Sequence, residues 1–403
     1  MKILALSYLF PNSLNPEYGI FVYNRLKAVA LHCDLRVIVP LQWFPFLSRL
    51  RRSPSSNDSG IGKIERFQYV DGIHVFYPRF FSIPLIFKWI DSFSYFISIL
   101  PIISRLRTTD KFDFDIIDIH WTYPDILSGY LLSKIFRKKY IVTIRGMEAL
   151  YTEKKDFRRF ILNFCLKRAN KIVVLSYDLK IMVEKVGVKK EKIATILNGV
   201  DLNKFTYIEK KNACNKLGFD PAKIILLSIG RLTKQKGHHQ LLKVLPSLSE
   251  KYNVELHIIG GVNPEQDYSG ELKGLVAHLG LNNVYFHNNV QHENLAYWYA
   301  AADLFCLATY GEGCPNVVLE ALACGCPCVV SDVGAVSDLL TDGVNGFVVR
   351  MDDCNWQKYI EKALQCKWDR VHNAETMKGK SWAACAEEVL MVYKDVLESG
   401  NTR

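Results

Sequence analysis

Short apolar runs recur along this chain, and most of them are followed by a segment with helical periodicity. The first run, KILALSYLF at residues 2–10, precedes a loop rich in Pro, Asn and Gly and then a helix pattern over about 21–32. Apolar runs of about four to eight residues bounded by turn residues indicate buried strands. Strands that alternate with helices favour a parallel sheet with helices on both faces, so the sequence predicts the α/β class.

The same alternation is found in each half of the chain. The predicted strands of the first half are KILALSYLF, DLRVIVP, IHVFYP, FDIIDIHW, KYIVTIRG and NKIVVLS, and those of the second half are KIILLSIG, NVELHIIGG, NVYFHNNV, DLFCLAT, CPCVVSD and GFVVR. A chain of 403 residues is too long for one ordinary core. The turn segment NGVD at 198–201 follows the strand pattern KIATIL and separates the two series. We therefore predict a first domain over 1–198, a second over 199–380, and an amphipathic helix from about 381 to 398.

The net charge of +10 is concentrated in the first half of the chain. Residues 1–200 carry 31 Lys and Arg against 17 Asp and Glu, whereas residues 201–403 carry 20 against 24. A basic half predicts an anionic partner: a nucleic acid, a phosphorylated ligand or a membrane surface. A non-enzymatic nucleic-acid-binding protein is disfavoured, because no nucleic-acid-binding module is recognisable and the second half is negative.

One apolar stretch, residues 80–104, raises the question of membrane contact. A transmembrane helix needs roughly 20 uninterrupted apolar residues, but Lys88 and Asp91 interrupt this stretch and Pro84 and Pro101 bracket it. We therefore expect a buried or half-buried helix, with a helix that docks on a lipid surface as the alternative. A second candidate lipid contact combines aromatic and basic residues: Trp43, Phe44, Phe46, Arg49, Arg51 and Arg52.

The eleven cysteines predict neither a disulfide framework nor a zinc site. Several lie inside apolar runs, and no second Cys or His pair stands at zinc-finger spacing. The chain opens directly on a strand pattern rather than on a secretory signal. We therefore expect reduced, mostly buried thiols in a cytoplasmic protein.

Two glutamates, Glu312 and Glu320, lie in the segment EGCPNVVLE directly after the predicted strand DLFCLAT. Pro315 suits the first position of a helix because its missing N–H costs nothing there, so we predict a helix over about 315–324. The start of that helix would face the carboxyl edge of the sheet, where open α/β sheets bind ligands, and its amides suit phosphate or sugar hydroxyls. The two carboxylates can then hold two parts of one ligand, although a helix cap and a solvated glutamate explain the same spacing.

A second candidate site is the loop that follows the predicted strand KIILLSIG. Arg231 and Lys236 lie there, in the segment GRLTKQKG. Arg231 can bind phosphate with a fork of donors and Lys236 supplies a point charge, so together they can stabilise a leaving diphosphate. Taken alone, the two residues are explained equally by a solvated basic loop.

Three other nucleotide- and metal-binding patterns are missing from the sequence. The loop after the first strand lacks the Gly-x-Gly-x-x-Gly pattern, which disfavours a nicotinamide oxidoreductase. There is no Walker phosphate loop, and no Asp-x-Asp motif at a strand end predicts a metal-bound diphosphate.

The motifs together resemble the large retaining glycosyltransferase family four. GRLTKQKG is followed by EGCPNVVLEALACGCPCVVSDVGA and then by DGVNGFVV. The resemblance covers essentially the whole chain and is strongest over about 195–350. It implies the GT-B architecture, in which two Rossmann-like doubly wound domains face each other across a cleft. It also implies that the helix within 381–403 crosses back onto the N-terminal domain.

The resemblance assigns donor-binding roles to the second domain. Arg231 and Lys236 correspond to the pair that grips the donor diphosphate. Glu320 corresponds to the second glutamate of the E-x7-E motif, which holds the ribose hydroxyls, and Glu312 to the first, which lies near the transferred sugar. The remaining positions contact the donor through the backbone or form a glycine turn beside the nucleotide: Cys314, Pro315, Asn316, Gly260 and Gly261.

Four positions of the first domain and its boundary also correspond to family positions. Gly19 matches the glycine of the first loop, which lets the backbone approach the donor, and His120 matches a histidine near the donor sugar. Asn198 belongs to the interdomain segment, and Arg145 begins a segment similar to the family's His/Arg-Gly-x-Asp/Glu motif. The alternative for His120 is a histidine satisfied at a strand end, and for Arg145 a structural salt bridge.

The resemblance implies an EC 2.4 enzyme that moves a sugar from a nucleoside-diphosphate sugar to an acceptor hydroxyl, with retention. The catalytic residues would be Glu312, His120, Arg231 and Lys236. No metal ion or other cofactor is expected, because two cations and helix N-termini neutralise the diphosphate. A glycan or lipid-linked acceptor of cell-surface polysaccharide synthesis is expected on the basic first domain, with the protein peripheral on the inner face of the membrane.

A nucleotide-sugar epimerase of similar two-domain fold is the main alternative. The spacing of Arg231, Lys236, Glu312 and Glu320 favours the transferase. The two activities differ in a simple way, since an epimerase forms a new sugar from the nucleotide sugar alone and needs no acceptor.

Overall fold

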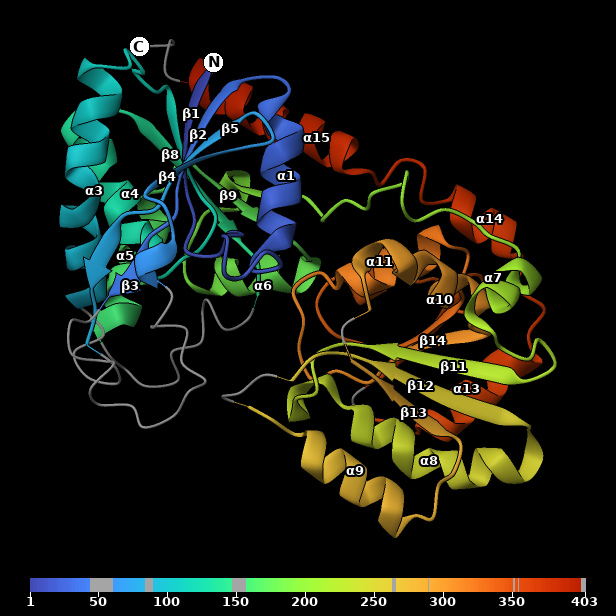
Figure 1. Cartoon of the computed structure of the whole chain (residues 1–403). Helices are drawn as coiled ribbons and strands as arrows, with labels where there is room; N and C mark the ends of the chain where they lie inside the picture. Colours follow the sequence, from blue (N-terminus) through green and yellow to red (C-terminus); the bar gives the residue numbers. More distant parts are fainter. Residues whose placement is uncertain are drawn as a thin grey trace. The chain divides into compact units, whose positions relative to one another are not determined.

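The computed structural model of the chain describes residues 1–43, 61–83, 90–146, 157–262, 266–288, 290–350, 352–353 and 355–399. The chain divides into two compact units: Met1–Asn198 together with Trp382–Arg403, and Gly199–Ser381. Each unit is built on its own central sheet (Figure 1). The last helix of the chain therefore belongs to the first unit.

In the first unit the described residues form an eight-stranded sheet, sheet 1. Its strands in spatial order are β10 (Ile193–Thr195), β9 (Lys171–Val174), β8 (Lys139–Ile144), β7 (Ile116–Ile119), β1 (Lys2–Leu6), β2 (Asp34–Ile38), β5 (Ile73–Phe76) and β4 (Phe67–Val70). Neighbouring strands are parallel, except that β4 pairs antiparallel with β5 at the edge. Strands β1, β7 and β8 are buried over nearly their whole length, as expected when helices cover both faces.

Two layers of helices cover sheet 1. The helices of this unit are α1 (Ile20–Ala30), α3 (Ile90–Thr108), α4 (Asp125–Phe136), α5 (Phe157–Arg168), α6 (Tyr177–Lys185) and α15 (Trp382–Glu398). On one face α1 and α15 pack against each other, and Leu26 and Val389 join the core there. On the other face α3 packs against α4, and α4 against α5 (Figure 1).

The apolar stretch 80–104 is divided between two elements. Its first residues end the short strand β6 (Arg79–Phe81), which pairs with β3 (Leu41–Trp43) in a small separate sheet. Helix α3 begins at Ile90 and buries only one side, so the expected half-buried helix is confirmed for its described part. Among the described residues, no helix combines the length and the apolar character needed to cross a bilayer. Trp43 ends β3, whereas Phe44–Arg52 and residues 84–89 lie outside the described part.

In the second unit the described residues form a six-stranded parallel sheet, sheet 2. Its strands in spatial order are β13 (Val284–His287), β12 (Val254–Ile259), β11 (Ile224–Ile229), β14 (Leu304–Leu307), β15 (Cys328–Ser331) and β16 (Gly346–Val349). Helices α8 (His238–Lys251), α9 (Ser269–His278) and α13 (Trp356–Gln365) pack on one face. The other face carries α7 (Lys210–Leu217), α10 (Leu295–Ala301), α11 (Asn316–Ala323) and α14 (Arg370–Glu375), as Figure 1 shows.

The strand order reverses beside the first strand of each sheet. In sheet 2 the chain runs outward through β11, β12 and β13 and then returns to β14 on the other side of β11. In sheet 1 it runs outward from β1 through β2 and β5 and returns to β7 on the other side of β1. Open α/β sheets bind ligands outside the carboxyl ends of the strands at such a reversal. Each unit therefore has one position where a ligand site is expected.

The predicted fold class is confirmed, because both halves are doubly wound α/β units and every predicted strand is present. Three strands, β3, β4 and β6, were not predicted. They are short and partly exposed, so they lack the continuous apolar run that marks a strand buried on both faces.

Helix α15 is tied to the first unit by polar contacts as well as apolar ones. The hydroxyl of Tyr393 donates a hydrogen bond of 2.5 Å to Oδ2 of Asp118 in β7. Lys171 Nζ lies 2.7 Å from Asp395 Oδ2. Tyr393 and Asp118 are each only 1% exposed, so water cannot replace the hydroxyl, and a buried carboxylate needs such donors.

We expect Tyr393→Phe to lower the free energy of unfolding of the first unit by about 1–3 kcal/mol, since it removes one of the donors of a buried carboxylate oxygen. Urea denaturation followed by circular dichroism measures the change. Tyr69→Phe is the matched control, because Tyr69 is 65% exposed and its hydroxyl can bond to water instead. Equal stability of the two variants would show that the Tyr393–Asp118 bond does not hold α15 in place.

Candidate functional site

The residues predicted to bind a donor in the second unit lie together at the carboxyl edge of sheet 2. Arg231 and Lys236 are in the loop after β11, and Glu312 follows β14. These two strands flank the reversal in strand order. The position that topology favours for a ligand is therefore the position that carries the predicted charges.

Close backbone contact joins the loops after β11 and β14, and it requires glycine. A Cβ on Gly237 would lie 1.8 Å from the carbonyl oxygen of Ala308, which is far inside contact distance. Gly237 also has φ of +69°, where glycine is favoured. Beside this contact the amide of Tyr310 donates to the carbonyl of Gln235 at 2.9 Å. The two loops therefore hold each other in place.

The glycine turn after β12 supports the same loop from the other side. A Cβ on Gly260 would lie 1.9 Å from the carbonyl oxygen of Gly230. The amide of Leu232 donates to the carbonyl of Gly261 at 3.0 Å. Gly260 and Gly261 thus fix the course of the backbone on either side of Arg231, which is what a glycine turn beside a bound nucleotide would have to do.

Lys236 and Glu312 form an ion pair between the two loops. Their side chains are 24% and 18% exposed, so the pair is largely sheltered from water. The stem of Lys236 runs along Gly230, where a Cβ would lie 3.2 Å from Lys236 Cδ. Arg231 is exposed and forms no ion pair with any residue that the structure describes. Of the two predicted phosphate-binding cations, Lys236 is therefore neutralised by Glu312, whereas Arg231 is open.

His238, the first residue of α8, lies beneath this loop and is 1% exposed. Its Nδ1 is 3.0 Å from the hydroxyl of Ser228, and its Nε2 is 3.2 Å from the carbonyl oxygen of Gly230. The carbonyl can only accept, so the hydrogen-bond network assigns the proton to Nε2 of a neutral ring. Burial lowers the pKa of His238 to about 4, although its bond to Gly230 acts in the opposite direction.

Glu320 lies within α11 and is 9% exposed. Its Oε2 accepts a hydrogen bond of 2.8 Å from the hydroxyl of Tyr299, and its Oε1 is 3.4 Å from Nε2 of His292. These contacts fix the orientation of the carboxylate. Glu320 is therefore a buried, oriented acceptor, and the alternative of a solvated glutamate is wrong for this residue.

The turn that leads into α11 is also tightly packed. Cys314 and Pro315 are buried, and Asn316 is the first residue of the helix. Pro315 is the N-cap rather than the expected first helical residue, because its ψ of 107° is extended. Gly334, from the loop after β15, supports the turn, since a Cβ there would lie 2.4 Å from the carbonyl oxygen of Gly313.

The predicted residues of the first unit lie at the carboxyl edge of sheet 1. Gly19 is the N-cap of α1, with φ of +70°, and a Cβ there would lie 2.5 Å from the carbonyl carbon of Leu9. His120 directly follows β7, Arg145 follows β8, and Asn198 comes after β10. Nη2 of Arg145 is 2.9 Å from Nδ1 of His120, and its Nη1 is 3.4 Å from Oδ1 of Asn198. The structure thus joins three of these four predicted residues, His120, Arg145 and Asn198, in one cluster.

The cluster around His120 is a buried chain of charges. Nε2 of His120 lies 2.8 Å from Oδ2 of Asp118, and His120 is 1% exposed. Burial lowers the pKa of His120, with Arg145 adding to this effect and Asp118 opposing it. Burial disfavours the charge of Asp118, but His120, Tyr393 and Arg145 outweigh that cost and hold its pKa below the usual range. Both ring nitrogens of His120 thus have protein partners, and a contact with a sugar stays a prediction.

The described cysteines are free thiols, and eight of them are buried. Burial raises the pKa of Cys326 to about 12, so this thiol stays protonated at neutral pH. Within the described ranges, no three His, Cys, Asp or Glu side chains are placed to share a metal ion.

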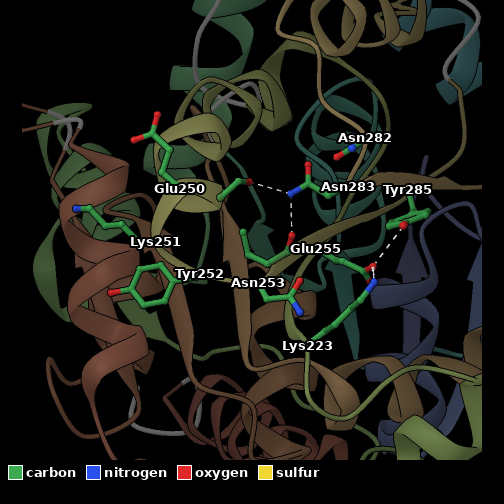
Figure 2. A pocket seen from close by; sticks show the side chains of 11 residues that line it. Lys223, Glu250, Lys251, Tyr252, Asn253, Glu255, Asn282, Asn283 and Tyr285 are labelled. Carbon is green, nitrogen blue, oxygen red and sulfur yellow. Dashed lines mark hydrogen bonds and ion pairs between the residues drawn. The ribbon is translucent and has the colours of Figure 1, made fainter.

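An open depression of about 660 Å³ lies at the opposite, amino edge of sheet 2 (Figure 2). Lys223 and Glu255 line it as an ion pair, and the hydroxyl of Tyr285 donates to Oε1 of Glu255 at 3.3 Å. None of the predicted donor-binding residues lines this depression. Lys223 and Glu255 neutralise each other there, unlike the open Arg231 at the carboxyl edge.

Two family models match the chain one after the other. Residues 67–204 match Glycosyltransferase Family 4, and residues 209–379 match Glycosyl transferases group 1. The chain belongs to this family of glycosyltransferases. The first match lies mostly in the first unit and the second lies wholly in the second unit, so each sheet carries its own part of the family pattern.

Similar proteins span most of the chain. An uncharacterized glycosyltransferase of Methanocaldococcus jannaschii is 27% identical over 356 residues, which are 83% of this chain and 88% of the relative. The putative teichuronic acid biosynthesis glycosyltransferase TuaC of Bacillus subtilis is 25% identical over 345 residues, 84% of this chain and 83% of the relative. The crystal structure of Anabaena HepE in complex with UDP has a TM-score of 0.73 at 19% identity and covers 98% of this chain and 100% of HepE. That likeness shows the GT-B fold of these glycosyltransferases.

The residues that hold the predicted ones in place were not found from the sequence. Asp118 had a visible signal, because it is a charge inside the apolar run IIDI of the predicted strand and stands two residues before His120, hence on the same face. Tyr299 and His292 had none, since nothing in their own segment points to Glu320. Tyr393 is 275 residues away from the aspartate that it contacts.

His238 makes the stability of the second unit depend on pH. Its pKa is about 4 in the folded chain against 6.5 for the free side chain, so the unfolded state binds more protons between these values. The stabilisation is complete above pH 6.5 and is lost as the pH falls toward 4. We expect the contribution of His238 to the free energy of unfolding to be about 2 kcal/mol smaller at pH 5 than at pH 7.5.

Urea denaturation of the wild type and His238→Gln at the two pH values measures this contribution. The variant should show a smaller drop in the free energy of unfolding between pH 7.5 and pH 5. His278→Gln, which changes an exposed histidine of the same unit, should keep the drop of the wild type. The same drop in His238→Gln would mean that His238 is not held neutral beneath the loop.

Proposed function

We propose that this chain transfers a sugar from a nucleoside-diphosphate sugar to an acceptor hydroxyl, with retention at the anomeric carbon. The observation that carries the proposal is the ion pair of Lys236 with Glu312 between the two loops at the reversal of sheet 2. Arg231 lies in the first of these loops, and Glu320 lies in α11, the helix that follows the second. Membership of the glycosyltransferase family supports transfer over epimerisation. The fold likeness to HepE, which was solved with UDP, supports a nucleoside diphosphate as the carrier.

In this proposal the second unit binds the nucleotide part of the donor. Arg231 and Lys236 neutralise the diphosphate, because a guanidinium fork and an ammonium both pair with phosphate oxygens. Glu320 accepts hydrogen bonds from the ribose hydroxyls. An ionised carboxylate has about four acceptor positions, so the contacts of Glu320 with Tyr299 and His292 leave room for two hydroxyls.

The remaining predicted residues surround the reacting sugar in the proposed mechanism. The backbone of Cys314, Pro315 and Asn316 contacts the sugar and the phosphate, and Gly260 and Gly261 leave room for the nucleotide. Amides in the first turn of a helix lack acceptors within the helix, so they suit anionic oxygens.

From the first unit, we propose that His120 positions the donor sugar and that Gly19 lets the backbone approach the donor. His120 already has Arg145 and Asp118 as partners, so it must give up or share one of these bonds. Arg145 and Asn198 act on His120 through the buried cluster rather than on the substrate directly.

The reaction itself exchanges one C–O bond for another. The bond between the anomeric carbon and the leaving phosphate oxygen breaks, and the acceptor oxygen bonds to the same face of the sugar. The acceptor proton passes to the leaving phosphate oxygen, which gives the glycosylated acceptor and a nucleoside diphosphate. Preorganised cations that meet the developing phosphate charge lower the barrier. In this proposal Arg231 and Lys236 supply that charge, and no metal ion is required.

We further propose a glycan or lipid-linked acceptor of cell-surface polysaccharide synthesis, used at the inner face of the cell membrane. The name of the relative TuaC refers to teichuronic acid biosynthesis, which supports a cell-surface product. The helices α3, α4 and α5 supply the structural support. Their two acidic residues, Asp91 and Asp125, are both buried, so every exposed charge on these helices is positive.

Two of these helices, α3 and α5, expose apolar side chains in stripes. On α3, Phe93, Ile97 and Leu100 are 39%, 66% and 36% exposed, at the spacing of one helix face. On α5, Phe157 and Phe160 are 51% and 63% exposed and their rings stack at 6.0 Å. Apolar stripes flanked by Lys and Arg suit the surface of an anionic bilayer. We therefore propose this face, named the α3–α5 face, as the membrane contact.

The donor site is tested by binding. We expect Glu320→Ala and Arg231→Ala each to weaken nucleoside-diphosphate affinity roughly 10- to 100-fold, because each removes hydrogen bonds to a charged group. Isothermal titration with UDP, GDP and ADP in buffer with EDTA measures the affinity.

A thermal-shift screen of nucleotide sugars identifies the donor, since a bound donor stabilises the fold. The chosen donor should react only when an acceptor is added.

Glu250→Ala and Lys251→Ala are the matched controls, because they remove charges from the same unit at the end of α8, beside the depression at the amino edge. Both should bind the nucleoside diphosphate as the wild type does. Unchanged affinity of Glu320→Ala and Arg231→Ala would refute the site, and a new nucleotide sugar formed without acceptor would favour an epimerase.

The membrane contact is tested by flotation with vesicles. We expect the double variant Ile97→Ser, Phe160→Ser to lose at least about fivefold in binding to vesicles with phosphatidylglycerol, because it removes apolar area from both stripes. Leu31→Ser, Met391→Ser is the control, since these side chains are 79% and 61% exposed elsewhere on the first unit. Wild type that stays unbound, or equal loss in both double variants, would exclude the α3–α5 face.

A further inference from the structure

The ion pair between Lys236 and Glu312 stands where the proposed function places a diphosphate. The two residues belong to loops whose backbones are held by the contact of Gly237 with Ala308. The hydroxyl of Thr309 also donates a hydrogen bond of 3.2 Å to the carbonyl oxygen of Gln235. These contacts hold Lys236 and Glu312 opposite each other, so their pairing does not depend on the motion of a free loop.

The surroundings of Lys236 favour Glu312 as its partner. Its stem lies against Gly230, and only its ammonium group projects from the loop toward Glu312. Arg231 leaves the same loop but forms no ion pair within the described ranges. The site therefore offers an incoming anion one open cation and one cation that already has a carboxylate.

We propose that Glu312 is an electrostatic competitor of the donor: it pairs with Lys236, and the diphosphate displaces it. This inference rests on the proposed function, because it takes the diphosphate as the ligand of Lys236. Glu312 weakens the binding of the nucleoside diphosphate, since binding must first break a sheltered ion pair. When the product leaves, the return of Glu312 to Lys236 speeds its release.

Competition for Lys236 and a simple contact with the sugar predict different effects of replacing Glu312. A residue that only binds the sugar would leave the affinity for a nucleoside diphosphate without sugar unchanged when it is replaced. A competitor for Lys236 would raise that affinity when its charge is removed. The sign of the effect on UDP, GDP or ADP therefore separates the two roles.

Glu312→Gln keeps the size and the hydrogen-bonding capacity of the side chain and removes its charge. We expect it to bind the nucleoside diphosphate roughly three- to thirty-fold more tightly than the wild type, in the range of a close charge pair. The change should lie mainly in a slower dissociation rate, measured by stopped flow. Titration with UDP, GDP and ADP, whichever the wild type binds, gives the affinity.

A double-mutant cycle with Lys236→Met tests whether the effect passes through Lys236. Methionine keeps an apolar stem without the charge. In the Lys236→Met background, Glu312→Gln should no longer tighten binding. Asp332→Asn is the matched control, because Asp332 is an exposed carboxylate directly after β15, at the same edge of the sheet, and accepts a hydrogen bond from Ser337 instead. It should change affinity by less than about twofold.

The outcomes separate this inference from the proposed function. A wild type that binds none of the three nucleoside diphosphates overturns both. A wild type that binds, with Glu312→Gln equal or weaker, overturns only the competition. Tighter binding that persists in the Lys236→Met background, or that Asp332→Asn reproduces, shows general charge repulsion and also overturns it.

Discussion

The contact between the backbone of Gly237 and the carbonyl of Ala308 decides where the charges of the second unit can stand. Any side chain at position 237 would force the loops after β11 and β14 apart. Those loops carry Arg231, Lys236 and Glu312, so their spacing depends on a single missing Cβ. The chemistry of the site is thus set by a backbone packing constraint before any side chain makes its own contact.

Both sheets reverse their strand order beside the first strand, but the two units use this reversal in different ways. At the reversal of sheet 2, short loops pack backbone to backbone and leave Arg231 open to solvent. At the reversal of sheet 1, the side chains of Asp118, His120 and Arg145 pair with one another and are buried. The first arrangement is ready to accept an anion, whereas the second has to exchange partners before it can take a new one. Equal topology therefore does not give equal readiness for a ligand.

The sequence predicted the parts of the fold that depend on long buried elements. Strands such as β1 and β11 are apolar at all but one position because both faces are covered, and that pattern is visible in the residues themselves. The edge strand β4 is short and partly exposed, so it lacks the continuous apolar run on which strands such as β1 and β11 were predicted. For the site, residue type and spacing led to Glu320 and Arg231. Their partners, such as Tyr299, depend on packing between distant segments, which leaves no local pattern.

One feature, the charge of Arg25, can be understood only from the sequence and the structure together. Arg25 lies on the apolar stripe of α1, where a charge is unusual, and the structure shows why it is tolerated. It is fully buried, and its Nη2 donates to the carbonyls of Ile196 and Leu197 at 3.2 and 3.1 Å. A charge that breaks an apolar stripe is therefore a useful signal that a backbone segment without regular partners passes nearby.

Helix α15 also has a consequence for how the chain folds as it is made. Val389 and Tyr393 complete the core of the first unit, yet they follow the whole of the second unit in the chain. At about 5–20 residues per second of synthesis, the first unit waits roughly 10–40 s for its last helix after residue 198 has been added. During that time one face of sheet 1 has α1 but lacks the part of its cover that α15 supplies. The second unit, whose residues are continuous in sequence, can finish folding first.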